Sequence, residues 1–342
     1  MIDQVLLRLT VHRAELRRRT LWPDPEALRR LRAGDTPVVP LDDPGAPTAV
    51  TFLDAEGSGP RRFEFASSPP FGLPHDAMVQ GVLFEPVGPA RGAVVLFPGA
   101  FTGINSGFER FYARMARGFA SRGTAAVLLT APLHKERAAM RADGQRELSG
   151  HDLLHGDIFT HVRAVGQAVR DVRATLGWLE SAYGRAGVWG VSLGAVVHSL
   201  VLTRDARPAF AVLIQPPVGR RTVFESPLLE VWTQQLRESG ITADDIAAAF
   251  APLDRRVPSR IAAAQILIQA GRHDMLAGPE GIEELRTLWG NPRVSWFDHG
   301  HTSIFIARRR LMAEALAFAE EAFAHGAGAG AASSEGALGE RS

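Results

Sequence analysis

Hydrophobic residues along the chain form short continuous runs that alternate with longer stretches of helical periodicity. A continuous apolar run is typical of a strand buried on both faces, and a spacing of three to four residues is typical of an amphipathic helix. The runs predict strands at 63–66, 78–85, 93–97, 124–130, 186–191, 209–214, 263–270 and 293–297. The periodic stretches predict helices at 108–122, 157–183, 193–202, 281–289 and 303–323. This alternation favours a mostly parallel central sheet with helices on both faces, an α/β architecture.

Four segments depart from this rhythm. Residues 1–62 predict two short helices, broken at Pro23 and Pro25, and an irregular linker, all packing on the core. The polar stretch 134–150 predicts a surface loop, and residues 216–260 predict a helical cap inserted into the 63–324 domain. The last segment, 325–342, is rich in Gly, Ala, Ser and Glu and predicts a disordered tail.

Composition excludes several classes of protein. The 342 residues carry a formal net charge of +1, and no local platform of basic and aromatic side chains indicates a nucleic-acid partner. No cysteine is present, so disulfides and thiolate chemistry are excluded. No signal peptide or run long enough to span a membrane is visible, which favours a cytoplasmic protein. The arginine-rich N-terminal helices leave contact with a membrane surface open, although a solvated arginine face is the simpler interpretation.

The pentapeptide 190–194, G-V-S-L-G, joins an apolar strand to a helix and places Ser192 at the tip of the turn. Strand, G-x-S-x-G and helix in this order are typical of a nucleophile elbow. Glycine is required at both flanking positions because the turn leaves no room for side chains there. The Leu193 backbone N–H would then face the position of a developing oxyanion.

A serine nucleophile needs a base and an orienting acid, which in this architecture follow it in the order acid, then histidine. Asp274 comes just after the strand at 263–270, and His301 comes just after the last strand, with His299 in reserve. The carboxyl ends of parallel strands share one edge, so we expect Ser192, Asp274 and His301 to meet there. Asp274 as a simple helix cap is the competing interpretation.

The second oxyanion donor is expected in the loop after the 93–97 strand. Pro98 has no N–H, which leaves Ala100 as the first choice and Phe101 as the alternative. Two further groups of polar residues carry weaker hypotheses. A metal site or a helix start could explain His151, Asp152, His155, Asp157 and His161, and the helix start is preferred because no step of the chemistry needs a metal. Arg220 and Arg221 could contact an acidic substrate group, but a solvated pair is the simpler interpretation.

These motifs resemble the α/β-hydrolase superfamily over residues 63–324, through 98–100, 190–194, 271–274 and Gly300-His301. The chain also resembles one branch, the abhydrolase domain-containing protein eighteen group. That closer likeness is carried by L-W-P-D-P at 21–25, by 128–132, by the elbow and by F-D-H-G-H-T-S at 297–303. The resemblance implies the α/β-hydrolase fold and a Ser-Asp-His triad. One departure is Pro98, where the superfamily commonly has histidine before the oxyanion-loop glycine.

We therefore hypothesise a serine hydrolase that cleaves an ester of an apolar or acyl small molecule through an acyl-enzyme, without cofactor or metal. In this scheme Ser192 attacks, His301 moves the proton, Asp274 orients the imidazole, and the Leu193 and Ala100 amides hold the oxyanion. The apolar content of the cap favours a dry pocket. An acyltransferase with the same triad and a non-catalytic binding protein on a hydrolase fold remain alternatives.

Overall fold

A computed structural model describes residues 25–335, except for 36–40, 42–46, 48, 56, 58, 68–72, 74–76, 101, 104–105, 156–157, 219–225, 227–232, 235–236 and 239. The first of the two predicted N-terminal helices, which precedes Pro23, lies outside the described residues. So do the predicted oxyanion alternative Phe101, the histidine-cluster member Asp157, and Arg220 and Arg221.

The described strands form one sheet in the order β1-β2-β3-β5-β4-β6-β7-β8-β9. From β5 to β9 all neighbours are parallel, whereas β1, β2 and β3 pair antiparallel at one side. The predicted mostly parallel sheet is confirmed, and the two-residue β1 is the strand that the pattern missed. The strands are β1 (Thr51–Phe52), β2 (Arg61–Ala66), β3 (Met78–Phe84), β4 (Gly92–Phe97), β5 (Thr124–Leu129), β6 (Ala186–Val191), β7 (Ala211–Ile214), β8 (Ile266–Gly271) and β9 (Arg293–Phe297).

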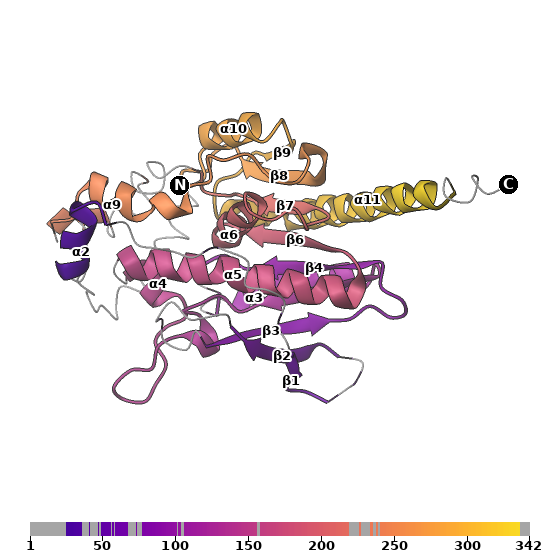
Figure 1. Ribbon diagram of the computed structural model, residues 1–342, viewed down its shortest axis with the longest axis horizontal. Coiled ribbons are helices and arrows are strands. Elements are labelled where there is room, and N and C mark those ends of the chain that lie inside the picture. Colours follow the sequence, from indigo (N-terminus) through magenta and orange to yellow (C-terminus); the bar gives the residue numbers. More distant parts are fainter. Residues whose placement is uncertain are drawn as a thin grey trace.

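Helices cover both faces of this sheet, in agreement with the prediction. Two separate clusters of buried side chains lie on the two faces, one including α5, α6 and α10 and the other including α3 and α11. Figure 1 shows α2 beside α9 at one end of the molecule, where Arg32 and Asp245 form an ion pair at 2.8 Å. The helices are α2 (Pro25–Arg32), α3 (Ser106–Ala120), α4 (His151–His155), α5 (Ile158–Tyr183), α6 (Leu193–Leu202), α9 (Ala243–Ala249), α10 (Pro279–Leu288) and α11 (Arg308–Glu335).

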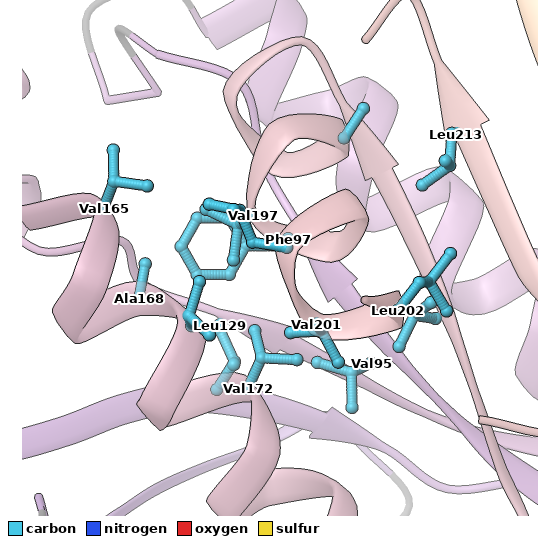
Figure 2. Packing of buried hydrophobic residues seen from close by; sticks show 14 of the residues in the cluster. Val95, Phe97, Leu129, Val165, Ala168, Val172, Val197, Val201, Leu202 and Leu213 are labelled. Carbon is cyan, nitrogen blue, oxygen red and sulfur yellow. The ribbon is translucent and has the colours of Figure 1, made fainter. Parts of the chain in front are cut away.

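The core beneath the elbow is built from β-branched and leucine side chains. In Figure 2, Val165 and Val172 of α5 face Val197 and Val201 of α6, with Phe97 of β4 between the two helices. These side chains are within about 2% of complete burial. At roughly 25 cal/mol per Å² of buried apolar area, such packing is the main stabilising contribution here. It holds α6, the helix that follows Ser192, firmly against the sheet.

The segment 134–150 differs from the predicted surface loop. It contains a short 3-10 helix at Lys135–Arg137, and Arg137 is only 1% exposed. Its guanidinium pairs with Asp171 of α5 at 2.7 Å and donates to the Thr130 carbonyl at 3.1 Å. Asp171 also accepts hydrogen bonds from Ser67 and Gln167. The polar sequence of this segment predicts exposure because the residues that bury Arg137 lie far away along the chain.

The end of the chain also differs from its prediction. The tail predicted to be disordered from residue 325 instead continues α11 as far as Glu335, and residues 336–342 lie outside the described part. In Figure 1 the helix runs out beyond the sheet toward the C-terminus. Extending an existing helix needs no new nucleation. Alanine has the highest helix propensity, so the alanines in this segment compensate for the low helix propensity of its glycines.

Candidate active site

Ser192 occupies the sharp turn between β6 and α6. Its backbone has φ 50° and ψ −110°, a conformation that a residue with a side chain rarely adopts and that costs about 1–3 kcal/mol. The surrounding structure over-determines it, since the Ser192 N–H donates to the Ile214 carbonyl of β7 at 2.9 Å and its own carbonyl starts α6. Strained backbone of this kind occurs often at functional sites. The same backbone angles direct the Ser192 side chain away from the end of β6.

The two glycines of the elbow are required by close backbone approaches. A Cβ on Gly190 would lie 2.5 Å from the carbonyl carbon of Gly194, and a Cβ on Gly194 would overlap the Phe97 carbonyl oxygen. Real Cβ atoms do not approach backbone this closely. The steric role predicted from the sequence for both glycines agrees with these contacts.

The structure brings together the three residues predicted from strand order. Asp274 follows β8, His301 follows β9, and both meet Ser192 at the carboxyl edge of the sheet. The His301 Nε2 lies 2.9 Å from the Ser192 Oγ, and its Nδ1 lies 2.8 Å from the Asp274 Oδ2. With the proton on Nδ1, the imidazole donates to the carboxylate and accepts from the hydroxyl. His299, the reserve candidate, instead uses its carbonyl to accept from the His273 N–H.

The Asp274 carboxylate is held in the charged form. It is 3% exposed, and its Oδ1 accepts hydrogen bonds from the Leu276 and Ala277 N–H groups, both at 2.8 Å. Burial alone would raise the pKa of Asp274, but the charge and hydrogen bond of His301 and the two backbone amides outweigh it and leave the pKa below its usual value. A buried carboxylate in this position fixes the His301 ring and stabilises it when it becomes protonated.

Gln215, just after β7, holds the loop that carries His301. It is fully buried with φ 49°, and its side-chain Nε2 donates to the Gly300 carbonyl at 2.9 Å. From the other side, the Gly300 N–H donates to the Ser303 hydroxyl at 2.9 Å. Sequence reasoning missed Gln215; the available signal was a polar residue directly following a wholly apolar strand.

The two backbone amides expected to be oxyanion donors both lie near Ser192. Among the residues that the structure describes, the Leu193 and Ala100 N–H groups have no hydrogen-bond acceptor. The neighbouring Gly99 N–H is already used, since it donates to the Tyr112 hydroxyl at 2.9 Å. A Cβ on Gly99 would lie 3.6 Å from the Ser192 Cβ, which places this loop directly beside the serine.

The described histidines at 151 and 161 contact other groups. His151 contacts the adjacent Asp152 at 3.1 Å, and His161 contacts the Leu153 carbonyl at 3.0 Å. Over the described part of the chain, no three His, Asp or Glu side chains are grouped closely enough to hold a metal ion. No described helix is both long and apolar enough to cross a membrane.

Three solved structures with a similar fold carry the name esterase. The chain superposes on an acetyl xylan esterase from Paenibacillus sp. R4 with a TM-score of 0.55 and 16% identity, covering 89% of this chain and 98% of that one. It superposes on acetyl xylan esterase 1 from Thermoanaerobacterium sp. JW/SL YS485 with a TM-score of 0.56 and 14% identity, covering 88% and 95%. A cold-adapted esterase from an Arctic intertidal metagenomic library gives a TM-score of 0.50 and 18% identity, covering 80% and 99%. Together with the sheet order, these similarities confirm the α/β-hydrolase fold.

Sequence comparison adds relatives without an assigned activity. Two uncharacterized proteins, from two strains of Mycobacterium tuberculosis, are 29% identical to this chain over 199 residues. The match covers 56% of this chain and 45% of each relative, so the chain spans about half the length of the curated relatives it matches. No protein-family model matches the chain.

Proposed function

We propose that this protein is a serine hydrolase that cleaves carboxylic esters through an acyl-enzyme. The observation that carries the proposal is the continuous hydrogen-bonded chain from the Ser192 hydroxyl through His301 to the buried Asp274 carboxylate. A serine in a merely structural turn needs neither partner. The esterase names of the structural neighbours support the choice of an ester as substrate. The closer resemblance to the abhydrolase domain-containing protein eighteen branch stays a prediction.

The reaction uses each group in turn. The Ser192 Oγ attacks the ester carbonyl carbon while its proton passes to the His301 Nε2, and the carbonyl oxygen becomes an oxyanion that accepts from the Leu193 and Ala100 amides. The C–O bond then breaks, and His301 returns the proton to the departing alkoxide, which leaves as the alcohol. Water repeats the attack on the acyl-serine with His301 as base, and this releases the acid and restores the Ser192 hydroxyl.

A small leucine cluster beside the oxyanion amides favours an apolar acyl group. Leu73, Leu133 and Leu153 are buried together with Ala164, apart from the two large clusters of the sheet faces. The side chains that pack against this cluster are those of Ala100 and Leu193, the two residues whose amides would hold the oxyanion. An acyl chain bonded to Ser192 would therefore lie next to the partly exposed apolar side chains of Ala100 and Leu193.

The decisive experiment compares Ser192→Ala with Ser199→Ala. Both serines belong to the same segment, but the Ser199 hydroxyl donates to the Ala195 carbonyl within α6 and is remote from His301. We expect Ser192→Ala to lower kcat for short p-nitrophenyl esters by roughly 10³-fold or more and to abolish fluorophosphonate labelling. Ser199→Ala should keep both. Ester turnover that survives in Ser192→Ala, or a wild type that neither turns over esters nor labels, would refute the proposal.

A further inference from the structure

We infer that the hydroxyls of Thr102 and Tyr112 preset the direction of the Ala100 oxyanion amide and act as positioning residues for the reaction. This inference rests on the proposed function and goes beyond the triad. It starts from an unusual property of the loop after β4: its backbone is held by side-chain hydroxyls at two successive peptide units rather than by backbone partners.

The first hold acts on the peptide that contains the oxyanion donor. The Thr102 Oγ1 donates to the Gly99 carbonyl at 2.8 Å, and Thr102 is 5% exposed. The Gly99 carbonyl and the Ala100 N–H belong to one planar trans peptide, in which C=O and N–H point in opposite directions. Fixing the carbonyl on Thr102 therefore fixes the Ala100 N–H on the opposite side, without any contact to that N–H itself.

The second hold acts on the preceding peptide. The Gly99 N–H donates to the Tyr112 Oη at 2.9 Å, and Tyr112, which lies on α3, is 2% exposed. Burial raises the pKa of Tyr112 to about 12, so the hydroxyl stays neutral at any working pH. The Tyr112 ring is itself fixed by edge contacts with Phe111 and Trp189. Glycine has little conformational restriction of its own. The hydrogen bonds of Tyr112 and Thr102 are therefore both needed to fix the orientation of the Gly99–Ala100 peptide.

A further layer fixes Thr102 in its turn. The Ser149 hydroxyl donates to the Thr102 carbonyl and accepts from the Lys135 N–H at 3.1 Å. The Lys135 ammonium pairs with Glu109 of α3 at 2.6 Å. The segment 134–150, expected from its polarity to be an exposed loop, thereby closes a ring of contacts around the oxyanion loop. The donors are in place before substrate arrives, which is the condition for electrostatic catalysis without reorganisation.

The test compares Thr102→Val and Tyr112→Phe with two matched variants. Thr102→Val keeps the shape and removes the hydroxyl, whereas Thr102→Ser keeps the hydroxyl. The control for Tyr112→Phe is Tyr183→Phe. Tyr183 is the last residue of α5, where its hydroxyl contacts Glu85, and the whole length of β6 separates it from Ser192. Removing an oxyanion donor lowers kcat by about 10²–10³-fold. A donor that is present but wrongly oriented should lower kcat by less.

We expect Thr102→Val and Tyr112→Phe each to lower kcat about tenfold with KM nearly unchanged. The affinity for a trifluoromethyl ketone, whose adduct with Ser192 carries an oxyanion, should fall by the same factor, while the pH profile of kcat should not move. Thr102→Ser should restore most of kcat, and Tyr183→Phe should match wild type. Thermal unfolding confirms that each variant is folded. Either folded variant decides, because each removes a hydroxyl that contacts the Gly99 backbone, and the two hydroxyls also hydrogen-bond to each other.

Two outcomes separate the inference from the proposed function. If Ser192→Ala is inactive while Thr102→Val and Tyr112→Phe keep kcat and ketone affinity within twofold of wild type, the positioning role is wrong and the hydrolase stands. If Ser192→Ala retains activity, the proposed function fails first. A loss in Thr102→Ser equal to that in Thr102→Val would also overturn the inference, because the hydroxyl would then not be responsible.

Discussion

A buried histidine on α6, the helix that follows Ser192, should make the free energy of unfolding depend on pH by a predictable amount. His198 of α6 is fully buried, its ring lies 6.2 Å from that of Phe97, and neither ring nitrogen has a hydrogen-bond partner among the described residues. Burial lowers the pKa of His198 from 6.5 to about 3. The folded protein therefore keeps this imidazole neutral, whereas the unfolded chain protonates it below pH 6.5.

The size of the effect follows from that difference. The unfolded state binds one more proton than the folded state between pH 6.5 and pH 3, so acid lowers the free energy of unfolding by up to about 1.4 kcal/mol per pH unit from this group. Integrated from pH 7 to pH 5, the loss is about 2 kcal/mol. His198→Leu removes the titrating group and keeps an apolar side chain of similar volume. The variant should therefore gain about 2 kcal/mol relative to wild type over this range.

The assay is urea unfolding of both proteins at pH 8.5, 7, 6 and 5. The quantity compared is the difference in free energy of unfolding between the two proteins, here called the gap, and its change with pH. Groups common to both proteins cancel in this difference, including His134, whose pKa burial lowers to about 4. Between pH 8.5 and 7 the gap should stay constant within error, because the imidazole is then mostly neutral in both states. A gap that stays constant down to pH 5 would refute a buried, neutral and unpartnered His198.

Two other substitutions test the site and its support. Asp274→Asn keeps the acceptor for Leu276 and Ala277 but offers an amide N–H₂ to His301, which forces the wrong tautomer; kcat for esters should fall by roughly 10⁴-fold, and a loss below tenfold would contradict this. Arg137→Met leaves the Asp171 carboxylate buried without its cation and should lower the urea-derived free energy of unfolding by about 3–5 kcal/mol. The double variant Arg137→Met/Asp171→Leu should recover most of that loss, and an equal loss in both would show that the unpaired charge is not the cause.

Strand positions and the convergence of the triad residues were predictable because both depend on local signals. A strand buried on both faces must be continuously apolar, and 186–191 matches β6 residue for residue. The prediction at 293–297 also matches β9, although this edge strand begins at the exposed Arg293 and is only partly buried. The placement of Asp274 and His301 followed from a general property of parallel sheets, since their strands end at one edge. What was predicted there is the meeting of the side chains; their catalytic roles stay a proposal.

Isolated polar residues with distant partners were not predictable. Gln215, Thr102 and Tyr112 are each hydrogen-bonded to a backbone group, and no periodicity marks such a residue. Arg137 in a charged stretch reads as exposed until Asp171, 34 residues later, is placed against it. Side-chain pairing of this kind depends on tertiary contacts that a single sequence does not encode locally.

The order of the strands has one further consequence. β9, which leads into His301, has a single neighbour in the described sheet, whereas β6, which leads into Ser192, lies between β4 and β7. Edge elements open at a lower free energy than central ones. His301, the proposed base, therefore depends on an edge strand, so warming should abolish the proposed turnover reversibly before the molecule as a whole melts. Heat tolerance of turnover and heat tolerance of the fold are then separate properties, and changes along the β8–β9 ladder would alter the first with little effect on the second.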